Sequence, residues 1–385
     1  MPIEMTICLP AYKEENIAAT LNSLARADSS GLKIRVRILV NGSELDTKEI
    51  KKVNAQCIAD LRTWLTNYSG HLDIDYFVNL NLEPKHAGVG LARRILGDEA
   101  AKYYQQKGED GVIVYLDADC LVSSNYFQEI NHFFTSSRFE AAAIHFEHNI
   151  GDESADRSIM EYEAHLRYYI LMQRWLSLPY AIHTVGSSMA VRSSSYLAKG
   201  GMNRRKAGED FYFLQKYIKD QVCGNIQNAT VYPSGRESDR VPFGTGRAMQ
   251  KYREENFVWP TYNPLSFKLL RPFLDNLSDY YENSFSENAF DNRLSSFLKK
   301  IKVEETIDMI KKNVSSYEAF QKRFFQFFDA FQLMKCLHFL RDDGGIGDIP
   351  LSEAVKWYFQ EIGIKTEKGT YLDALREIDK KTALQ

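Results

Sequence analysis

Short apolar runs and longer amphipathic segments take turns along the first 120 residues of the chain. Each apolar run is closed by turn residues, and each segment that follows repeats its apolar residues at helical spacing. The predicted strands are 6–9, 33–40, 72–78 and 111–116, and the predicted helices are 14–26, 48–68 and 89–105. This alternation predicts an α/β fold with a mostly parallel, doubly wound sheet. Ligands of such sheets bind beyond the carboxyl ends of the strands, so the chemistry is expected in the loops there.

The pattern loosens after residue 139 and changes again after residue 255. In the middle stretch the expected elements are strands at 141–146 and 188–191 and helices at 154–178 and 210–219. Three prolines then interrupt a polar, aromatic stretch, at Pro260, Pro264 and Pro272, and beyond them 296–340 and 351–360 have helical periodicity. We therefore predict an α/β domain over 1–255, with halves 1–120 and 121–255, and a helical C-terminal domain over 256–385.

Composition narrows the class of protein. The 385 residues allow about two domains, and 44% hydrophobic with 26% charged residues is typical of folded globular chains. A net charge of -3 gives no general attraction to nucleic acid, so no nucleic-acid partner is expected. No apolar run spans a bilayer and the first residues lack a signal-peptide pattern, so a cytoplasmic protein is expected. The five cysteines form no CxxC pair and are interpreted as buried thiols.

The strongest local signal is Asp117-Ala118-Asp119, directly after the apolar run 111–116. Two carboxylates at i and i+2 on a turn after a strand can share one divalent cation. Mg²⁺ and Mn²⁺ prefer oxygen ligands and leave positions open for substrate phosphates. An ordinary acidic loop is the alternative interpretation. The position of the segment at the end of a buried strand nevertheless favours metal and diphosphate binding by Asp117 and Asp119.

A second acidic pair, Glu209-Asp210, opens a predicted helix after Gly208. A carboxylate beside a bound leaving group could take the proton of an attacking hydroxyl, which is the work of a general base. A helix N-cap is the plainer interpretation of Asp210.

Two cationic, glycine-containing segments could contact phosphate. Lys85 and Arg93 lie in a segment with a Gly-containing loop before a helix, and Arg236 and Arg240 lie in a loop rich in Arg and Gly. Arginine pairs with phosphate through parallel hydrogen bonds, and such loops can cover a bound diphosphate. A solvated loop is the alternative for 235–247.

Taken together, five segments resemble those of a GT-A fold glycosyltransferase of the large family-two type, which transfers sugars from nucleotide sugars. The segments are Leu9-Pro10-Ala11-Tyr12-Lys13-Glu14, Val40-Asn41-Gly42-Ser43, 85–94, Asp117-Ala118-Asp119 and Glu209-Asp210. They occur in the family's order, which is more specific than any one of them. The resemblance implies the GT-A fold, with 1–120 as the nucleotide-sugar half and 121–255 as the acceptor half.

The resemblance also implies roles for individual residues. Asp119 would hold Mn²⁺ or Mg²⁺, Asp117 would lie toward the ribose, and Asp210, next to Glu209, would be the general base. Residues implied to contact the nucleotide sugar are Pro10, Tyr12, Glu14, Asn41 at the base, Lys85 and Arg93. The implied reaction is a metal-assisted, in-line displacement from a nucleotide-diphosphate sugar to a hydroxyl of a carbohydrate or glycoconjugate acceptor, with inversion. A hexosyltransferase-like enzyme is expected.

Three departures from the family pattern keep alternatives open. Lys13 replaces the usual Asn, Asn41 replaces the first Asp of the base-binding pair, and Arg94 replaces the Asn after the Arg. Asn41 can accept from a ring N–H but offers no charge, so the nucleobase is not determined. A retaining transferase on the same fold and a catalytically silent nucleotide-sugar binder or scaffold are the alternatives.

The helical domain carries a dense aromatic run with Phe324, Phe325, Phe327, Phe328 and Phe331. A helix lying on a bilayer would use such residues, which would place the protein peripherally at the cytoplasmic membrane face. Core or dimer packing explains the run better, because apolar residues occupy too much of the helix circumference for one lipid-facing stripe.

Overall fold

The computed structural model describes residues 2–85, 87–150, 154–205, 208–235, 258–364 and 370–383. The chain divides into two compact units, and the division falls inside helix α5 (Ser154–Trp175). Unit 1 consists of Met1–Ile159, Ile182–Lys251 and Ala383–Gln385, and unit 2 of Met160–Ala181 and Tyr252–Thr382.

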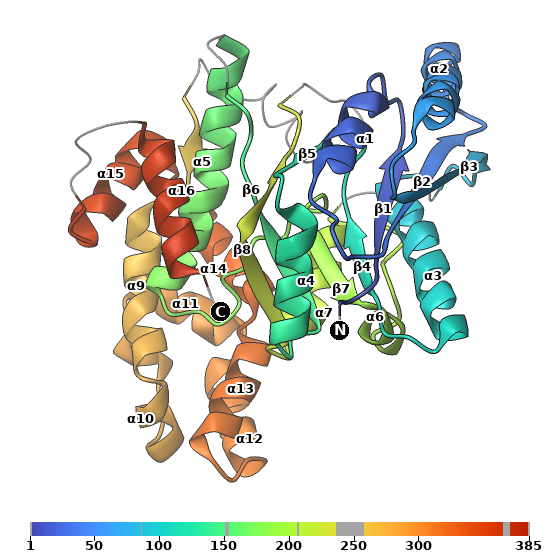
Figure 1. The fold of residues 1–385 in the computed structure, drawn as a ribbon. Coiled ribbons are helices and arrows are strands. Elements are labelled where there is room, and N and C mark those ends of the chain that lie inside the picture. The colour runs from blue at the N-terminus through green and yellow to red at the C-terminus, as the bar shows by residue number, and fades with distance from the viewer. Residues whose placement is uncertain are drawn as a thin grey trace. The chain divides into compact units, whose positions relative to one another are not determined.

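Unit 1 is built on an eight-stranded sheet with the strand order β3-β2-β1-β4-β7-β6-β8-β5 (Figure 1). The strands are β1 (Met5–Ala11), β2 (Ile34–Ser43), β3 (Asp73–Leu82), β4 (Val112–Tyr115), β5 (Leu121–Val122), β6 (Ala141–Phe146), β7 (Met189–Arg192) and β8 (Cys223–Tyr232). Four of the seven neighbouring pairs are parallel, and β4·β7, β6·β7 and β5·β8 are antiparallel. The predicted α/β class with a mostly parallel sheet is confirmed.

The strand directions bring several loops to one edge of the sheet. Since β7 is antiparallel to both β4 and β6, those two strands run the same way, as does β8, which pairs parallel with β6. The carboxyl ends of β1, β2, β4, β6 and β8 therefore share an edge with the start of β7. This edge collects the residues after Ala11, the last residues of β2 and the residues after Tyr115, which belong to three of the predicted site segments.

Helices cover the sheet because its central strands are apolar on both faces. All seven residues of β1 and all four of β4 are buried. The helices of unit 1 are α1 (Ile17–Arg26), α2 (Lys48–Asn67), α3 (Val89–Lys107), α4 (Tyr126–Ser136), α6 (Ser193–Ala198) and α7 (Glu209–Ile218), with the first six residues of α5. The chain steps outward from β1 to β3 and then back to β4, so right-handed connections place α3 on the face opposite α1 and α2.

The sequence did not predict β5, α4, α6 or β8. Strand β8 pairs Ile226 with Ile144 but Thr230 with His145, so three extra residues bulge out of the ladder. A bulge interrupts the two-residue period that identifies a strand in the sequence. Strand β3 also continues to Leu82, four residues past its predicted end.

Unit 2 is helical, as predicted for the C-terminal part. Its elements beyond α5 are α9 (Pro264–Asp275), α10 (Leu277–Glu282), the 3₁₀ turn η1 (Glu287–Ala289), α11 (Asn292–Lys300), α12 (Val303–Lys312), α13 (Tyr317–Phe327), α14 (Ala330–Asp342), α15 (Leu351–Glu361), α16 (Tyr371–Thr382), and the short antiparallel pair β9 (Pro260–Thr261) and β10 (Ile349–Pro350). The side chains of Ser316 and Asp329 accept from backbone N–H groups and begin α13 and α14. These caps divide the predicted helical stretch 296–340.

Two residues of the aromatic run, Phe324 and Phe328, pack into the core of unit 2. Phe324 and Phe328 are fully buried, and their rings lie 5.7 and 5.5 Å from the ring of Phe273. Phe285 and Phe290 contact the same ring from other directions. Core packing therefore accounts for Phe324 and Phe328, whereas Phe325, Phe327 and Phe331 are partly exposed, and for these three the dimer and membrane interpretations stay predictions.

Buried ion pairs fasten α16 to α5 within unit 2. Arg167 is fully buried, its Nε donates to Glu163 at 2.8 Å, and it also donates to Asp379. Arg376 donates to Glu163 at 2.7 Å, and Arg174 pairs with Asp379 at 2.7 Å. Each carboxylate meets two guanidinium groups, which compensates for its removal from water.

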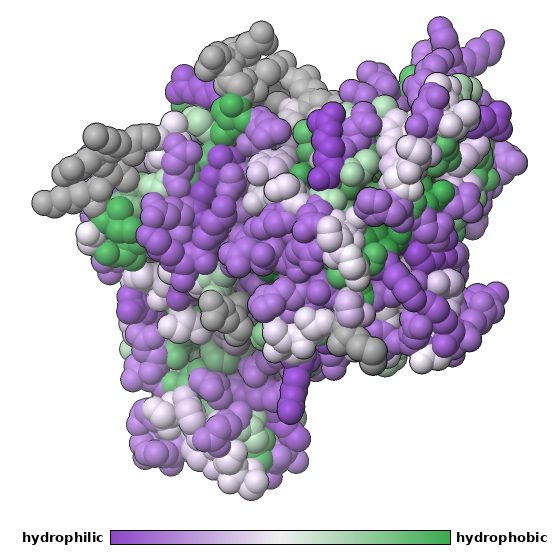
Figure 2. Space-filling model, in the orientation of Figure 1, coloured by the Kyte–Doolittle hydropathy of each residue, from purple (hydrophilic) through white to green (hydrophobic). Residues whose placement is uncertain are grey.

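No helix in the described part of the chain is long and apolar enough to cross a membrane. On the face of the molecule drawn in Figure 2, hydrophilic residues cover most of the surface, and hydrophobic residues appear as small, separate patches.

Candidate nucleotide and catalytic site

Arg93 joins two of the predicted acidic segments. This residue is 3% exposed, its Nη1 donates to Glu209, and its Nη2 donates to Asp117 Oδ1 at 2.5 Å. Burial alone would lower the pKa of Arg93, but the carboxylates of Asp117, Glu209 and Asp210 raise it above its ordinary value. The guanidinium is therefore a fixed positive charge that holds Asp117 and Glu209 together, although 24 and 116 residues of sequence separate them from it.

Glycines allow this close approach. A Cβ at Gly186 would lie 2.3 Å from Nη1 of Arg93, so the backbone before β7 rests directly on the guanidinium. A Cβ at Gly90 would lie 2.2 Å from the carbonyl oxygen of Arg205. The first turn of α3 thus packs against the segment that leads into Glu209. Gly186 was not predicted from the sequence, where its only signal is a glycine just before an apolar strand at the ligand edge.

Asp210 is half-buried in the first turn of α7, beside this group. Its Oδ1 accepts the N–H of Phe211 at 2.7 Å. Burial, followed by the neighbouring Glu209 charge, raises the pKa of Asp210 from 3.8 to about 6, although Arg93 acts in the opposite direction. A carboxylate with this pKa is largely ionised at pH 7 and is still basic enough to accept a proton.

The raised pKa predicts a measurable dependence of stability on pH. Between pH 4 and pH 6 the unfolded chain has released the Asp210 proton while the folded chain still holds it, so the free energy of unfolding falls as pH rises through this window. Asp210→Asn has no carboxyl group at this position, so this pH-dependent change in stability should be absent from the variant. Urea unfolding at pH 4, 5, 6 and 7 measures the effect. From pH 4 to pH 6, the free energy of unfolding of the variant should rise relative to that of the wild type by up to about 3 kcal/mol. A difference that does not vary with pH would contradict the assignment.

A second group of polar residues gathers where β1 and β2 end side by side. The Tyr12 hydroxyl donates to Asp46 Oδ1 at 3.0 Å, and the Ser43 N–H donates to Asp46 Oδ2 at 2.8 Å. Pro10 is buried in β1 and pairs with Leu39 of β2. Leu39 lies two residues before Asn41, so Pro10 and Asn41 belong to the same end of the two strands. Glu14 is buried, and its Oε1 accepts the N–H groups of the turn before α1, which gives it a structural role.

Asn54 organises this corner from α2. Its Oδ1 accepts the N–H of Lys13 at 2.9 Å, and its Nδ2 donates to the carbonyl of Asn41 at 3.2 Å. The φ of Lys13 is +53°, a conformation that this hydrogen bond helps to hold. Asn41 is 4% exposed, and its Oδ1 finds no hydrogen-bond partner within the described residues. Asp46 and Asn54 were not predicted from the sequence, where the available signal for Asn54 is a polar residue on the apolar face of 48–68.

The residues present fit a divalent cation through Asp119. Asp117 Oδ1 is occupied by Arg93, whereas Asp119 is half-buried two residues later, past the end of β4. The described ranges contain no cluster of three or more His, Cys, Asp or Glu that could hold a metal ion. Asp119 would leave most of the positions around such a cation open, and Mg²⁺ commonly fills such positions with phosphate oxygens and water.

Three predicted residues are not joined to this group. Lys85 is exposed, and no described contact brings it to the acidic residues. Arg236 and Arg240 lie outside the described residues. Their contacts with a nucleotide sugar stay predictions.

Comparisons with known proteins found similarity only at the level of structure. No protein-family model matches the chain, and the search of curated proteins found no significant match. Among solved structures, S. aureus TarS 1-349 in complex with UDP-GlcNAc is similar over 84% of this chain and 90% of that one, with 13% identity and a TM-score of 0.42. GalNAc-T7 with UDP, GalNAc and Mn²⁺ is similar over 83% and 56%, with 14% identity and a TM-score of 0.40. Because both scores lie below 0.5, any functional assignment depends on the chain's own residues.

Proposed function

We propose that this chain is a glycosyltransferase that moves a sugar from a nucleotide-diphosphate sugar to a hydroxyl of a carbohydrate or glycoconjugate acceptor. The observation that supports this most is that Arg93 binds both Asp117 and Glu209. These three residues come from three of the five resembling segments, namely 85–94, 117–119 and 209–210. A ligand at the carboxyl edge of the sheet would meet Asp119, Tyr12 and Asn41 at neighbouring strand ends. Asp210 would face it from the first turn of α7.

In the proposed reaction, Asp210 accepts the proton of the acceptor hydroxyl. The acceptor oxygen forms a bond to the anomeric carbon of the donor while the bond from that carbon to the diphosphate breaks, and the nucleoside diphosphate leaves with the electron pair. Arg93 keeps Glu209 and Asp117 in position, and burial together with the Glu209 charge keeps the pKa of Asp210 raised. Displacement in one step would invert the anomeric carbon, as expected of a hexosyltransferase of this kind.

Mn²⁺ or Mg²⁺, held by Asp119 with Asp117 beside it, would supply positive charge that stabilises the leaving diphosphate. The nucleoside would bind where β1 and β2 end, at Tyr12, Asn41 and Asp46, with Asn41 at the base. NMR of the purified product would determine the anomeric configuration, and a retained configuration would replace the one-step scheme.

The proposal predicts which ligands stabilise the fold. One nucleotide among UDP, GDP, dTDP, CDP and CMP should raise Tm in the presence of Mn²⁺ or Mg²⁺, because a ligand that binds only the native state stabilises it by mass action. At 100 times its Kd this adds about 2.7 kcal/mol to the free energy of unfolding. EDTA should remove most of the shift, and Asp119→Asn should remove the part that depends on metal. The absence of a shift with every nucleotide would contradict the proposal.

A further inference from the structure

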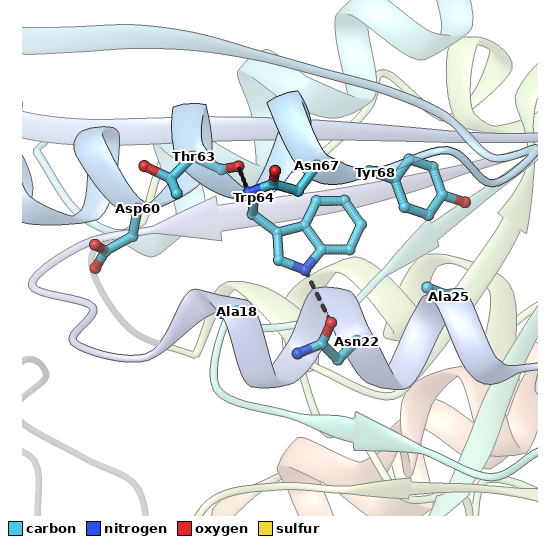
Figure 3. Close-up of a pocket in the computed structure, with 8 residues that line it drawn as sticks. All are labelled: Ala18, Asn22, Ala25, Asp60, Thr63, Trp64, Asn67 and Tyr68. Carbon is cyan, nitrogen blue, oxygen red and sulfur yellow. Dashed lines mark hydrogen bonds between the residues drawn. The ribbon is translucent and has the colours of Figure 1, made fainter.

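A groove of about 520 Å³ runs between α1 and α2 of unit 1, and the proposed reaction does not use it (Figure 3). Ala18, Asn22 and Ala25 line it from α1, and the C-terminal half of α2 lines it from the other side. Residues spaced by three and four positions share one face of a helix, so the two alanines leave room on either side of Asn22. None of these residues belongs to the candidate nucleotide and catalytic site.

The main feature of the groove is a fixed, partly exposed tryptophan. The rings of Trp64 and Tyr68 stack with centroids 4.6 Å apart at 19°, and Trp64 Nε1 donates to Asn22 Oδ1 at 2.9 Å (Figure 3). The indole is thus oriented from both helices before any ligand arrives. A preoriented side chain loses little rotamer freedom on binding, which favours affinity.

Polar groups around the indole have unused hydrogen-bonding capacity. Asn22 uses its carbonyl for Trp64, and its amide N–H groups donate to no other described residue. Asn67 donates to the Thr63 carbonyl, and Asp60 accepts from Gln56 through one oxygen, which leaves acceptor atoms on both. The groove therefore presents donors and acceptors around an aromatic surface.

These features match one class of ligand. A sugar ring has weakly positive C–H groups that suit the negative face of an indole, and its hydroxyls both donate and accept hydrogen bonds. A nucleotide or nucleic acid fits less well, because the described lining residues include no Lys or Arg for phosphate, and Asp60 would repel it. We infer that the α1–α2 groove is a binding site for neutral saccharides, separate from the transfer site.

Saturation-transfer NMR on the full chain, with maltotriose, cellotriose and chitotriose as probes, tests this inference. At least one probe should receive saturation from the protein, and titration should give its Kd. Trp64→Ala should weaken that probe at least tenfold, and so should Ala25→Leu, which fills the groove while leaving the indole in place. Trp357→Ala, which removes a partly exposed tryptophan of unit 2, is the matched control and should leave Kd unchanged.

Asp119→Ala separates this site from the proposed transfer site. Saccharide binding that survives Asp119→Ala and is lost in Ala25→Leu supports the inference, whether or not the chain proves to be a transferase. Binding that survives Trp64→Ala and Ala25→Leu, or binding lost in Asp119→Ala, overturns it. It is equally overturned if no probe binds, or if UMP and AMP receive saturation at this groove while the saccharides do not.

Discussion

Asp210→Asn is expected to slow sugar transfer by about 10² to 10⁴-fold, the range for losing a positioned general base. Asparagine keeps the shape of the side chain and can still accept the Phe211 N–H, but it cannot accept a proton from the acceptor hydroxyl. Donor binding should change little, because Asp210 acts on the acceptor in the proposed reaction. The measurement is the rate of nucleoside diphosphate release, with the nucleotide sugar selected by the thermal-shift panel.

The matched control for this prediction is Asp220→Asn, at the exposed end of the turn that follows α7. Its carboxylate pairs with Lys199 at the surface and should not affect the rate. If Asp210→Asn keeps most of its activity while it still binds donor, another residue is the base.

Arg93→Met is expected to lower the free energy of unfolding by about 3–5 kcal/mol, the cost of breaking a buried ion pair from one side. Glu209 is buried and would be left charged without its partner, whereas Asp117 is exposed enough to be solvated. The double variant Arg93→Met, Glu209→Gln removes both charges and should lose less than the single variant. Urea unfolding of the three proteins measures the difference.

Arg94→Met provides the control, because it removes the next arginine of the same helix. Arg94 is partly exposed, pairs with Asp98 at 3.2 Å and donates to the Met202 carbonyl, so its loss should cost about 1 kcal/mol. Equal losses in Arg93→Met and in the double variant would show that the cost comes from packing against Gly186 and not from the unpaired carboxylate.

The sequence indicated the elements around the site well, because apolar periodicity is a local property. Strand β6 and the starts of α2, α3 and α5 lie where the periodicity placed them. The short strand β5 and the bulged strand β8 were missed because neither carries a run of regular alternation. Helix α5 was predicted, but the sequence could not show that it is divided between the two compact units. The helical period shows that residues are buried on one face and not which unit they pack against.

The candidate site was predictable as separate segments but not as an arrangement. Asp119 and Asp210 follow from their positions after an apolar strand and before a helix. The role of Asn54 could not be read from its neighbours, because it depends on a hydrogen bond to Lys13, 41 residues away. The α1–α2 groove likewise depends on Asn22 meeting Trp64 across 42 residues.

By itself, the sequence determined most of the strands and helices around the site, which residues can ionise, and which of these follow a strand or begin a helix. Only the tertiary structure decided that Arg93 is buried between Asp117 and Glu209, and that burial, together with the adjacent Glu209 charge, raises the pKa of Asp210. The physical reason is that periodicity records whether a residue is buried, whereas hydrogen bonds and pKa shifts depend on which distant residue it is buried against.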